Sequence, residues 1–190
     1  TQILAENAYE RADSQLITLD DGTVVLAFID SDNAKGPYQR NTLKLATYRN
    51  GVWSNPVPVS VDDTADFQPS IAETKDGNVL VAWVSTGSND IDENTEVTDY
   101  LNSMEVYAAL ATIGEDGSIT MDEPVKITND HRINDGVEKG YYDCMPTVVC
   151  DKISGDAIVY YVKSGNTTTD GATLANPYRN DCRAFVIILH

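Results

Sequence analysis

One loop of the chain carries oxygen-bearing side chains at every second position. Asp90, Asp92 and Asn94 match the first, third and fifth ligand positions of calcium-binding loops, in which such oxygens converge on a hard cation. Two further features of those loops are missing from the sequence, because Thr95 stands in place of the glycine at the sixth position and Leu101 in place of the glutamate at the twelfth. The pattern therefore predicts either a calcium site or a solvated acidic loop.

A second set of polar residues lies just ahead of two apolar segments. Asp66 and Gln68 precede one segment, and Tyr142 and Asp143 take the similar place one unit later. Together with Arg11, near the start of the chain, they offer carboxylates, an amide, a phenol and a guanidinium, all of which can hydrogen-bond a polar ligand. We expect these five side chains to surround a common mouth in which a ligand binds.

The elements that must position these residues are copies of one hairpin. Each copy reads as a strand, a turn with glycine, and a second strand that ends near an aromatic residue. The copies cover residues 16–29, 71–84 and, more loosely, 147–162. Their turn glycines are 55 residues apart (77 − 22) and then 78 apart (155 − 77). Large repeats with several short strands each are typical of β-propeller blades.

Each predicted unit continues beyond its first hairpin. In the first unit Asn50-Gly51 is a hairpin-turn signal, and the segment after it contains two prolines, which sheets tolerate at an edge. We therefore predict an all-β chain of about three four-stranded antiparallel blades. The predicted boundaries are an outer strand over residues 1–8, blade units over 9–62 and 63–130, and a unit over 131–190 that lacks its outer strand.

Three blades are too few for a closed propeller, which needs about four to eight. The free faces of the first and last blades would leave large apolar side chains in water, at about 1.5–3 kcal/mol each. We therefore expect this segment to be half of a six-bladed propeller. Either the remaining blades of a longer parent chain or a second copy of this segment would complete the ring.

Charge and cysteine content exclude several functions. The 190 residues include 30 acids and 13 bases, for a net charge of −17, which disfavours binding to nucleic acid and to anionic membranes. No apolar run approaches the roughly 18 residues of a membrane-spanning helix. The three cysteines have no spacing typical of zinc sites. A Cys150–Cys182 disulfide and buried free thiols both remain open.

Two short segments resemble the sialidase-like propeller family. Residues 48–54 are similar to its Asp-box turn, although only Gly51, Trp53 and Ser54 of that motif remain. Residues 11–16 are similar to the Arg-Ile-Pro opening of a sialidase's first blade. The resemblance implies that Arg11 is one of three arginines that hold a substrate carboxylate, but Asp13 replaces the family's proline and would repel that substrate. The family's other two arginines, and its tyrosine nucleophile with the glutamate that activates it, would lie in later blades.

These observations predict a non-catalytic, extracellular module that binds a glycan or protein at a cell surface. The alternative is a fragment of an exo-sialidase-type glycoside hydrolase whose other catalytic residues lie outside this segment. A third hypothesis is a structural propeller whose ligand is another domain of the same polypeptide. No cofactor is expected apart from the calcium ion considered above.

Overall fold

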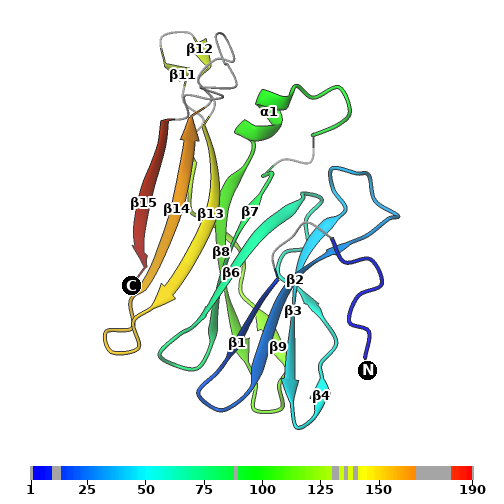
Figure 1. Ribbon diagram of the computed structural model, residues 1–190, viewed down its shortest axis with the longest axis vertical. Helices are drawn as coiled ribbons and strands as arrows, with labels where there is room; N and C mark the ends of the chain where they lie inside the picture. The colour runs from blue at the N-terminus through cyan, green and yellow to red at the C-terminus, as the bar shows by residue number, and fades with distance from the viewer. Residues whose placement is uncertain are drawn as a thin grey trace, which may run out of the picture.

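The computed structural model shows three antiparallel β-sheets that pack one against the next (Figure 1). It describes residues 2–9, 14–87, 90–129, 133–134, 137–138, 141–165 and 181–189. We call the sheets blade 1, blade 2 and blade 3 in chain order. Each begins with an inner strand and continues outward through antiparallel neighbours, as the repeated hairpin predicts. The chain is therefore an all-β partial propeller.

Blade 1 follows the predicted strand order. It contains β1 (Gln15–Thr18), β2 (Val24–Ser31), β3 (Asn41–Arg49) and an outer strand in two pieces, β4 (Val52–Trp53) and β5 (Val57–Pro58). The turn between β3 and β4 has positive φ angles at Asn50 (51°) and Gly51 (85°). Such angles suit the twist of a tight hairpin and favour an Asn-Gly pair. The outer strand is interrupted between its two pieces, next to Pro56.

Blade 2 repeats this plan with a longer insertion. It contains β6 (Asp66–Glu73), β7 (Val79–Ser85), β8 (Glu105–Ile113) and an outer strand split into β9 (Ile119–Met121) and β10 (Val125–Lys126). The loop between β7 and β8 contains the helix α1 (Val97–Asn102).

Blade 3 has three strands in the part that the structure describes. They are β13 (Tyr141–Cys150), β14 (Ala157–Gly165) and β15 (Asp181–Leu189). A small hairpin of β11 (Ile133–Asn134) and β12 (Val137–Glu138) precedes them.

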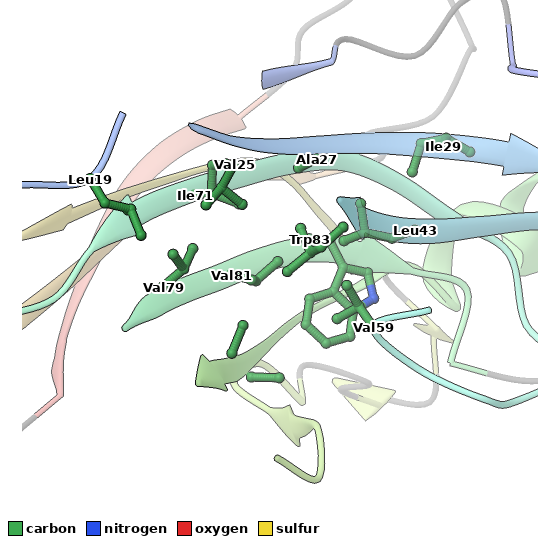
Figure 2. Close-up of a cluster of buried hydrophobic side chains, with 13 residues drawn as sticks. Leu19, Val25, Ala27, Ile29, Leu43, Val59, Ile71, Val79, Val81 and Trp83 are labelled. Atoms are coloured by element: carbon green, nitrogen blue, oxygen red, sulfur yellow. The ribbon is translucent and has the colours of Figure 1, made fainter. Parts of the chain in front are cut away.

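Two apolar layers hold the blades together. The layer between blades 1 and 2 is shown in Figure 2, where Trp83 lies among aliphatic side chains from both sheets. The layer between blades 2 and 3 is made of Leu80, Ala82, Val106, Ala108, Val148, Ala157, Val159 and Tyr161. A blade in the middle of the stack is therefore buried on both faces, which explains why all seven residues of β7 are buried.

Side-chain acceptors also join the inner strands of successive blades. The Gln15 Oε1 atom accepts the backbone N–H of Ile71 at 3.1 Å, and the Ser70 Oγ atom accepts that of Val148 at 3.0 Å. Gln15 and Ser70 occupy equivalent positions in their blades. Gln15 lies opposite Ala27 and Ser70 lies opposite Ala82, and each of these alanines directly precedes the aromatic residue of its strand. The blades thus follow one another by a repeated contact.

The beginning of the described chain lies beside blade 1. Of the outer strand expected over residues 1–8, residues 2–8 are described, and Ala8 forms an isolated antiparallel bridge with Asp30 of β2. The backbone N–H groups of Tyr9 and Ser31 donate to the carbonyls of Ile29 and Asn7. Whether this segment completes a further blade stays a prediction.

The cysteines in blade 3 answer one open question. Cys150 is a half-buried free thiol, in agreement with one of the two alternatives for this residue. Cys150 lies opposite Ala157, whereas Cys182 lies opposite Ser164, seven residues along the same strand. At ~3.3 Å per residue this separation is about 23 Å, far beyond disulfide reach. The alternative of a Cys150–Cys182 disulfide was therefore wrong. Within the described segments, no helix has the length and apolar character needed to cross a membrane.

Candidate functional site

One edge of the blades, which we call the upper rim, carries the longer loops. It is the edge where β2, β7 and β14 end and where the inner strands β6 and β13 begin, since neighbouring strands are antiparallel. The loop 32–40 after β2 and the loop 86–104 after β7 extend from this edge in the upper part of Figure 1. The opposite edge carries short turns. Binding groups are most often found on loops supported by a rigid scaffold, which directs attention to the upper rim.

Four aromatic rings from separate parts of the chain gather at the upper rim. Tyr9 packs edge-on against Phe67 of β6 with ring centroids 6.3 Å apart, and Tyr38 packs edge-on against Tyr100 of α1 at 6.4 Å. Burial raises the pKa of Tyr100, and electrostatic repulsion from Tyr9 and Tyr38 raises it further, which links the two pairs electrostatically. All four side chains are half-buried. We call them the aromatic cluster.

Contacts between the loops hold the aromatic cluster in place. The Gln39 Nε2 atom, next to Tyr38 in the chain, donates a hydrogen bond to the backbone oxygen of Ile91 at 2.8 Å. Ile91 is buried, and it ties the loop 86–104 to the loop 32–40. The segment 2–9, the loop 32–40 and the loop 86–104 are far apart in the sequence, and they converge beside β6, the first strand of blade 2.

Asp66 is the first residue of β6, and its side chain lies between blades 1 and 2 with 1% of the residue exposed. Its carboxylate accepts hydrogen bonds from the backbone N–H of Leu43 and from Trp83 Nε1, both at 2.9 Å, and from the Ser60 hydroxyl at 3.4 Å. Burial raises the pKa of Asp66 to about 7, although the N–H of Leu43 acts in the opposite direction. The residue joins two blades at the rim and faces away from solvent.

Asp143 takes the equivalent place at the junction of blades 2 and 3 and is also 1% exposed. Neither oxygen of its carboxyl group has a hydrogen-bond partner. Close by, the buried Glu105 accepts the Thr128 hydroxyl at 2.5 Å and pairs with Lys126 Nζ at 3.2 Å. Burial raises the pKa of Asp143 to about 7; the nearby Thr128 hydroxyl lowers it, and the charge of Glu105 raises it further.

Gln68 is exposed on the upper rim, in a bulge of β6. Its backbone has a φ of 50°, and Met145 in the equivalent bulge of β13 has a φ of 53°. Non-glycine residues rarely adopt this conformation. The Gln68 Oε1 atom accepts the backbone N–H of Met145 at 2.8 Å, so the two bulges support each other across neighbouring blades. Strained positions of this kind are often kept near binding sites.

The structure places only part of the expected mouth. Asp66, Gln68 and Asp143 lie at the same edge of neighbouring inner strands, but two of the three are buried between blades. Tyr142 lies in β13, and its side chain is outside the part that the structure describes. Arg11 is also outside the described residues. The ligand-binding role of these five residues stays a prediction.

The acidic loop forms its own hydrogen bonds. The Asp92 carboxylate accepts the backbone N–H of Asn94 at 2.8 Å and the Thr95 hydroxyl at 3.2 Å. The N–H of Asn94 is the main reason that the pKa of Asp92 is lowered. Asp90 and Asp92 are exposed, and the described residues contain no group of three acidic, histidine or cysteine side chains suited to a metal ion. Calcium binding at Asp90, Asp92 and Asn94 stays a prediction.

A cavity of about 410 Å³ lies between the first described residues and blade 1. Residues 3–7 form one wall, and Asp30, Asp32 and Lys44 are among the residues of the other. Lys44 and Asp30 form an ion pair across the β2–β3 ladder. The lining is mainly polar, which suits a small polar ligand. Because Tyr9 follows directly on this segment, residues 2–9 contribute to both the cavity and the aromatic cluster.

Sequence reasoning missed the aromatic cluster and Glu105. Tyr9, Tyr38 and Tyr100 lie in irregular segments, where no periodic pattern marks which residues will meet. Glu105 was not distinguished from the other acids of an acidic chain. Its signal was its place at the start of a buried strand, since a carboxylate there is rarely left without a partner.

Comparisons with known proteins match the architecture of this chain but not its sequence. No family model matches the chain, and no curated protein sequence matches it. Among solved structures, it is similar to the GH93 α-L-arabinofuranosidase of Fusarium graminearum in complex with arabinobiose, with a TM-score of 0.50 and 13% identity over 92% of this chain and 50% of that one. It is also similar to the inulosucrase from Halalkalicoccus jeotgali bound to kestose, with a TM-score of 0.54 and 14% identity over 95% of this chain and 52% of that one.

Both of these proteins are β-propellers, and at such low identity the similarity concerns the fold alone. It agrees with the blade architecture expected from the repeats. This chain spans about half the length of each of the two structures that it matches. The three blades described above are thus part of a β-propeller architecture.

Proposed function

We propose that this chain is part of a sialidase-like, non-catalytic propeller module that binds a glycan outside the cell, at a cell surface. The observation that carries the proposal is the aromatic cluster of Tyr9, Tyr38, Phe67 and Tyr100 on the upper rim. These side chains come from separate elements and are half-buried. Each ring therefore packs against the protein on one side and is accessible to solvent on the other.

The composition of this region suits a sugar. Sugars present apolar C–H faces together with hydroxyl groups, and small-molecule sites combine apolar and aromatic walls with a few polar groups. Here the exposed Gln68 follows Phe67 directly, and residues 3–7, which precede Tyr9 in the chain, line the polar cavity. The two similar propellers were solved with arabinobiose and kestose, which supports an oligosaccharide as the ligand class.

Charge favours a neutral glycan over an anionic one. The chain has a net charge of −17, and Asp32, Asp62, Asp90 and Asp92 are exposed on loops of the upper rim. A sugar that carries a carboxylate would be repelled by this field. A sialidase must instead hold such a carboxylate with arginines. The acidic rim therefore supports the non-catalytic hypothesis.

Titration calorimetry of the 190-residue chain with arabinobiose, kestose and 3′-sialyllactose tests the proposal. We expect a neutral sugar to bind and Tyr38→Ala to weaken its affinity about tenfold, since an aromatic contact contributes about 0.5–1.5 kcal/mol beyond area burial. Tyr48→Ala, which removes a similarly half-exposed ring far from the upper rim, is the matched control. Equal losses in both variants, or no binding of either neutral sugar, would overturn the proposal.

The second candidate is a fragment of an exo-sialidase. It is favoured by the resemblance of Arg11 and its neighbours to the opening of a sialidase's first blade. A retaining sialidase would also need a nucleophile and an acid/base group from further blades. Turnover of a fluorogenic sialoside by a longer protein that contains this segment, abolished by Arg11→Ala, would replace the non-catalytic hypothesis with this one.

A further inference from the structure

The outer face of blade 3 exposes a continuous set of large apolar side chains. We call it flank 3, and it consists of Val149 on β13, Ile158 and Tyr160 on β14, and Val186 and Ile188 on β15. Residues directly opposite in a sheet share a face, and the register pairs Val149 with Ile158, Ile158 with Ile188, and Tyr160 with Val186. The exposed fractions of Val149, Tyr160, Val186 and Ile188 are 58%, 38%, 58% and 53%.

The equivalent face of blade 2 is covered. Leu80, Ala82 and Ala108 stand at the register positions of Ile158, Tyr160 and Val186, and they are buried against blade 3. Their exposed fractions are 8%, 0% and 5%. Flank 3 thus repeats a surface that this fold uses to pack against the next blade.

The outer face of blade 1 is open in part, although Phe28 and Ala46 on it are buried, and the open part matches the other side of such a contact. We call it flank 1, and it consists of Leu16, Val24, Leu26 and Tyr48, with Leu16 61% and Tyr48 38% exposed. The residues at the equivalent positions of blade 2 are Ile71, Val79, Val81 and Ala111, all of which are buried against blade 1. Flank 1 therefore has the register and the apolar character of a face that receives the preceding blade.

A polar contact repeats in the same way. Gln15 and Ser70 each accept a backbone N–H from the inner strand of the following blade. Thr147 occupies the equivalent position on β13 and is exposed at flank 3. If blade 1 of a second copy follows blade 3, the Thr147 hydroxyl is placed to accept the backbone N–H of Leu16 in that copy. Leu16 occupies the position in blade 1 that Ile71 and Val148 occupy in blades 2 and 3.

We propose that flank 3 of one copy packs on flank 1 of a second copy, and that the reciprocal contact closes a two-copy ring of six blades. Two identical junctions then cover both open faces, which is the closed symmetry expected of a stable homo-oligomer. A second copy also fits by chain length, since each of the two similar propellers is about twice as long as this chain. Two copies supply the number of blades at which propellers close.

Sedimentation velocity of the 190-residue chain at micromolar concentration and physiological salt tests this inference. We expect a species of 41.4 kDa, twice the mass of 20.7 kDa. Salt is needed because each copy carries a net charge of −17. Val186→Asp and Leu16→Asp place a charge in a desolvated apolar contact and should each raise the dissociation constant about 100-fold or more. Val61→Asp, at a side chain that is 93% exposed outside both flanks, should leave it unchanged.

Mixing the two flank variants distinguishes a ring from other dimers. In a mixed pair one junction combines both substitutions and the other is intact, so mixtures should recover part of the association that each variant lacks. A two-copy species that survives Leu16→Asp overturns the inference, because it would pair flank 3 with itself. A monomeric wild-type chain, or an open series of larger assemblies, overturns it as well. Circular dichroism shows whether each variant is folded, and a monomeric wild type overturns the inference without any variant.

Discussion

Replacing Asp66 by asparagine should change how the stability of the protein depends on pH. Burial raises the pKa of Asp66 from 3.8 to about 7 in the folded chain. Between these two values the folded state binds more protons at this site than the unfolded state, so the free energy of unfolding falls as pH rises. A difference of about 3 units (7 − 3.8) at 1.36 kcal/mol per unit gives about 4 kcal/mol between pH 4 and pH 8.

Urea unfolding followed by circular dichroism at pH 5, 6, 7 and 8 measures this effect. Because an asparagine side chain cannot ionise, Asp66→Asn should gain stability relative to the wild type by up to about 1.4 kcal/mol for each pH unit until the pKa is passed. Asp76→Asn, at an exposed turn residue, removes the same charge without the buried site and serves as the control. The variant must still unfold in a single transition for the free energies to be compared.

The opposite result is physically possible and would refute this reasoning. Leu43 N, Trp83 Nε1 and the Ser60 hydroxyl all donate toward the Asp66 carboxylate, and such donors favour the ionised form. If they outweighed burial, the gap between Asp66→Asn and the wild type would be constant above pH 5 or would widen against the variant. A second substitution, Asp66→Ala, should cost about 2–6 kcal/mol near pH 4, because two buried donors lose their acceptor at about 1–3 kcal/mol each. This cost relative to the wild type should shrink as pH rises toward 8, since alanine cannot ionise either.

Three further predictions concern separate parts of the chain. Asp143→Asn should raise the melting temperature at pH 8 more than at pH 5, because it removes a buried carboxylate whose pKa is raised and whose oxygens have no partner; an equal shift at both values would contradict this. Calcium should raise the melting temperature of the wild type and not that of Asp92→Ala, whereas no shift in the wild type would count against the site. Leu45→Ala should lower the free energy of unfolding by about 2–5 kcal/mol in a urea titration, since Leu45 is fully buried; a loss below about 1 kcal/mol would contradict the packing described.

The blade architecture could be predicted from the sequence because its signals are local. A glycine turn between two apolar strands repeats three times, and Asn50-Gly51 marks the turn to the outer strand. Alternation along each strand then decides its register. The prediction of the outer strands was less accurate. In the structure each outer strand is broken into two short pieces, β4 and β5 or β9 and β10, and only part of the edge is paired. A proline-containing edge strand can lose part of its ladder with little effect on the core.

The candidate site was harder to predict, because its residues meet through loops. Tyr38 and Tyr100 are separated by several strands and irregular segments, and nothing in their spacing indicates contact. Asp66 was recognised as a polar residue at the start of an inner strand, but its burial depends on Leu43 and Trp83, which belong to different blades. Position within a blade is visible in the sequence, whereas the direction of a side chain at the junction of two blades is not.

The two proposals make separable demands on the molecule. The aromatic cluster is built from residues 9, 38, 67 and 100, which all belong to blades 1 and 2 of one copy. Closing the ring through flank 3 adds no residue to it. A monomeric Val186→Asp variant should therefore bind kestose as well as the wild type does. Catalysis of the sialidase kind would instead draw on groups from blades beyond these three, so activity that requires ring closure would favour the enzyme hypothesis over a simple binding module.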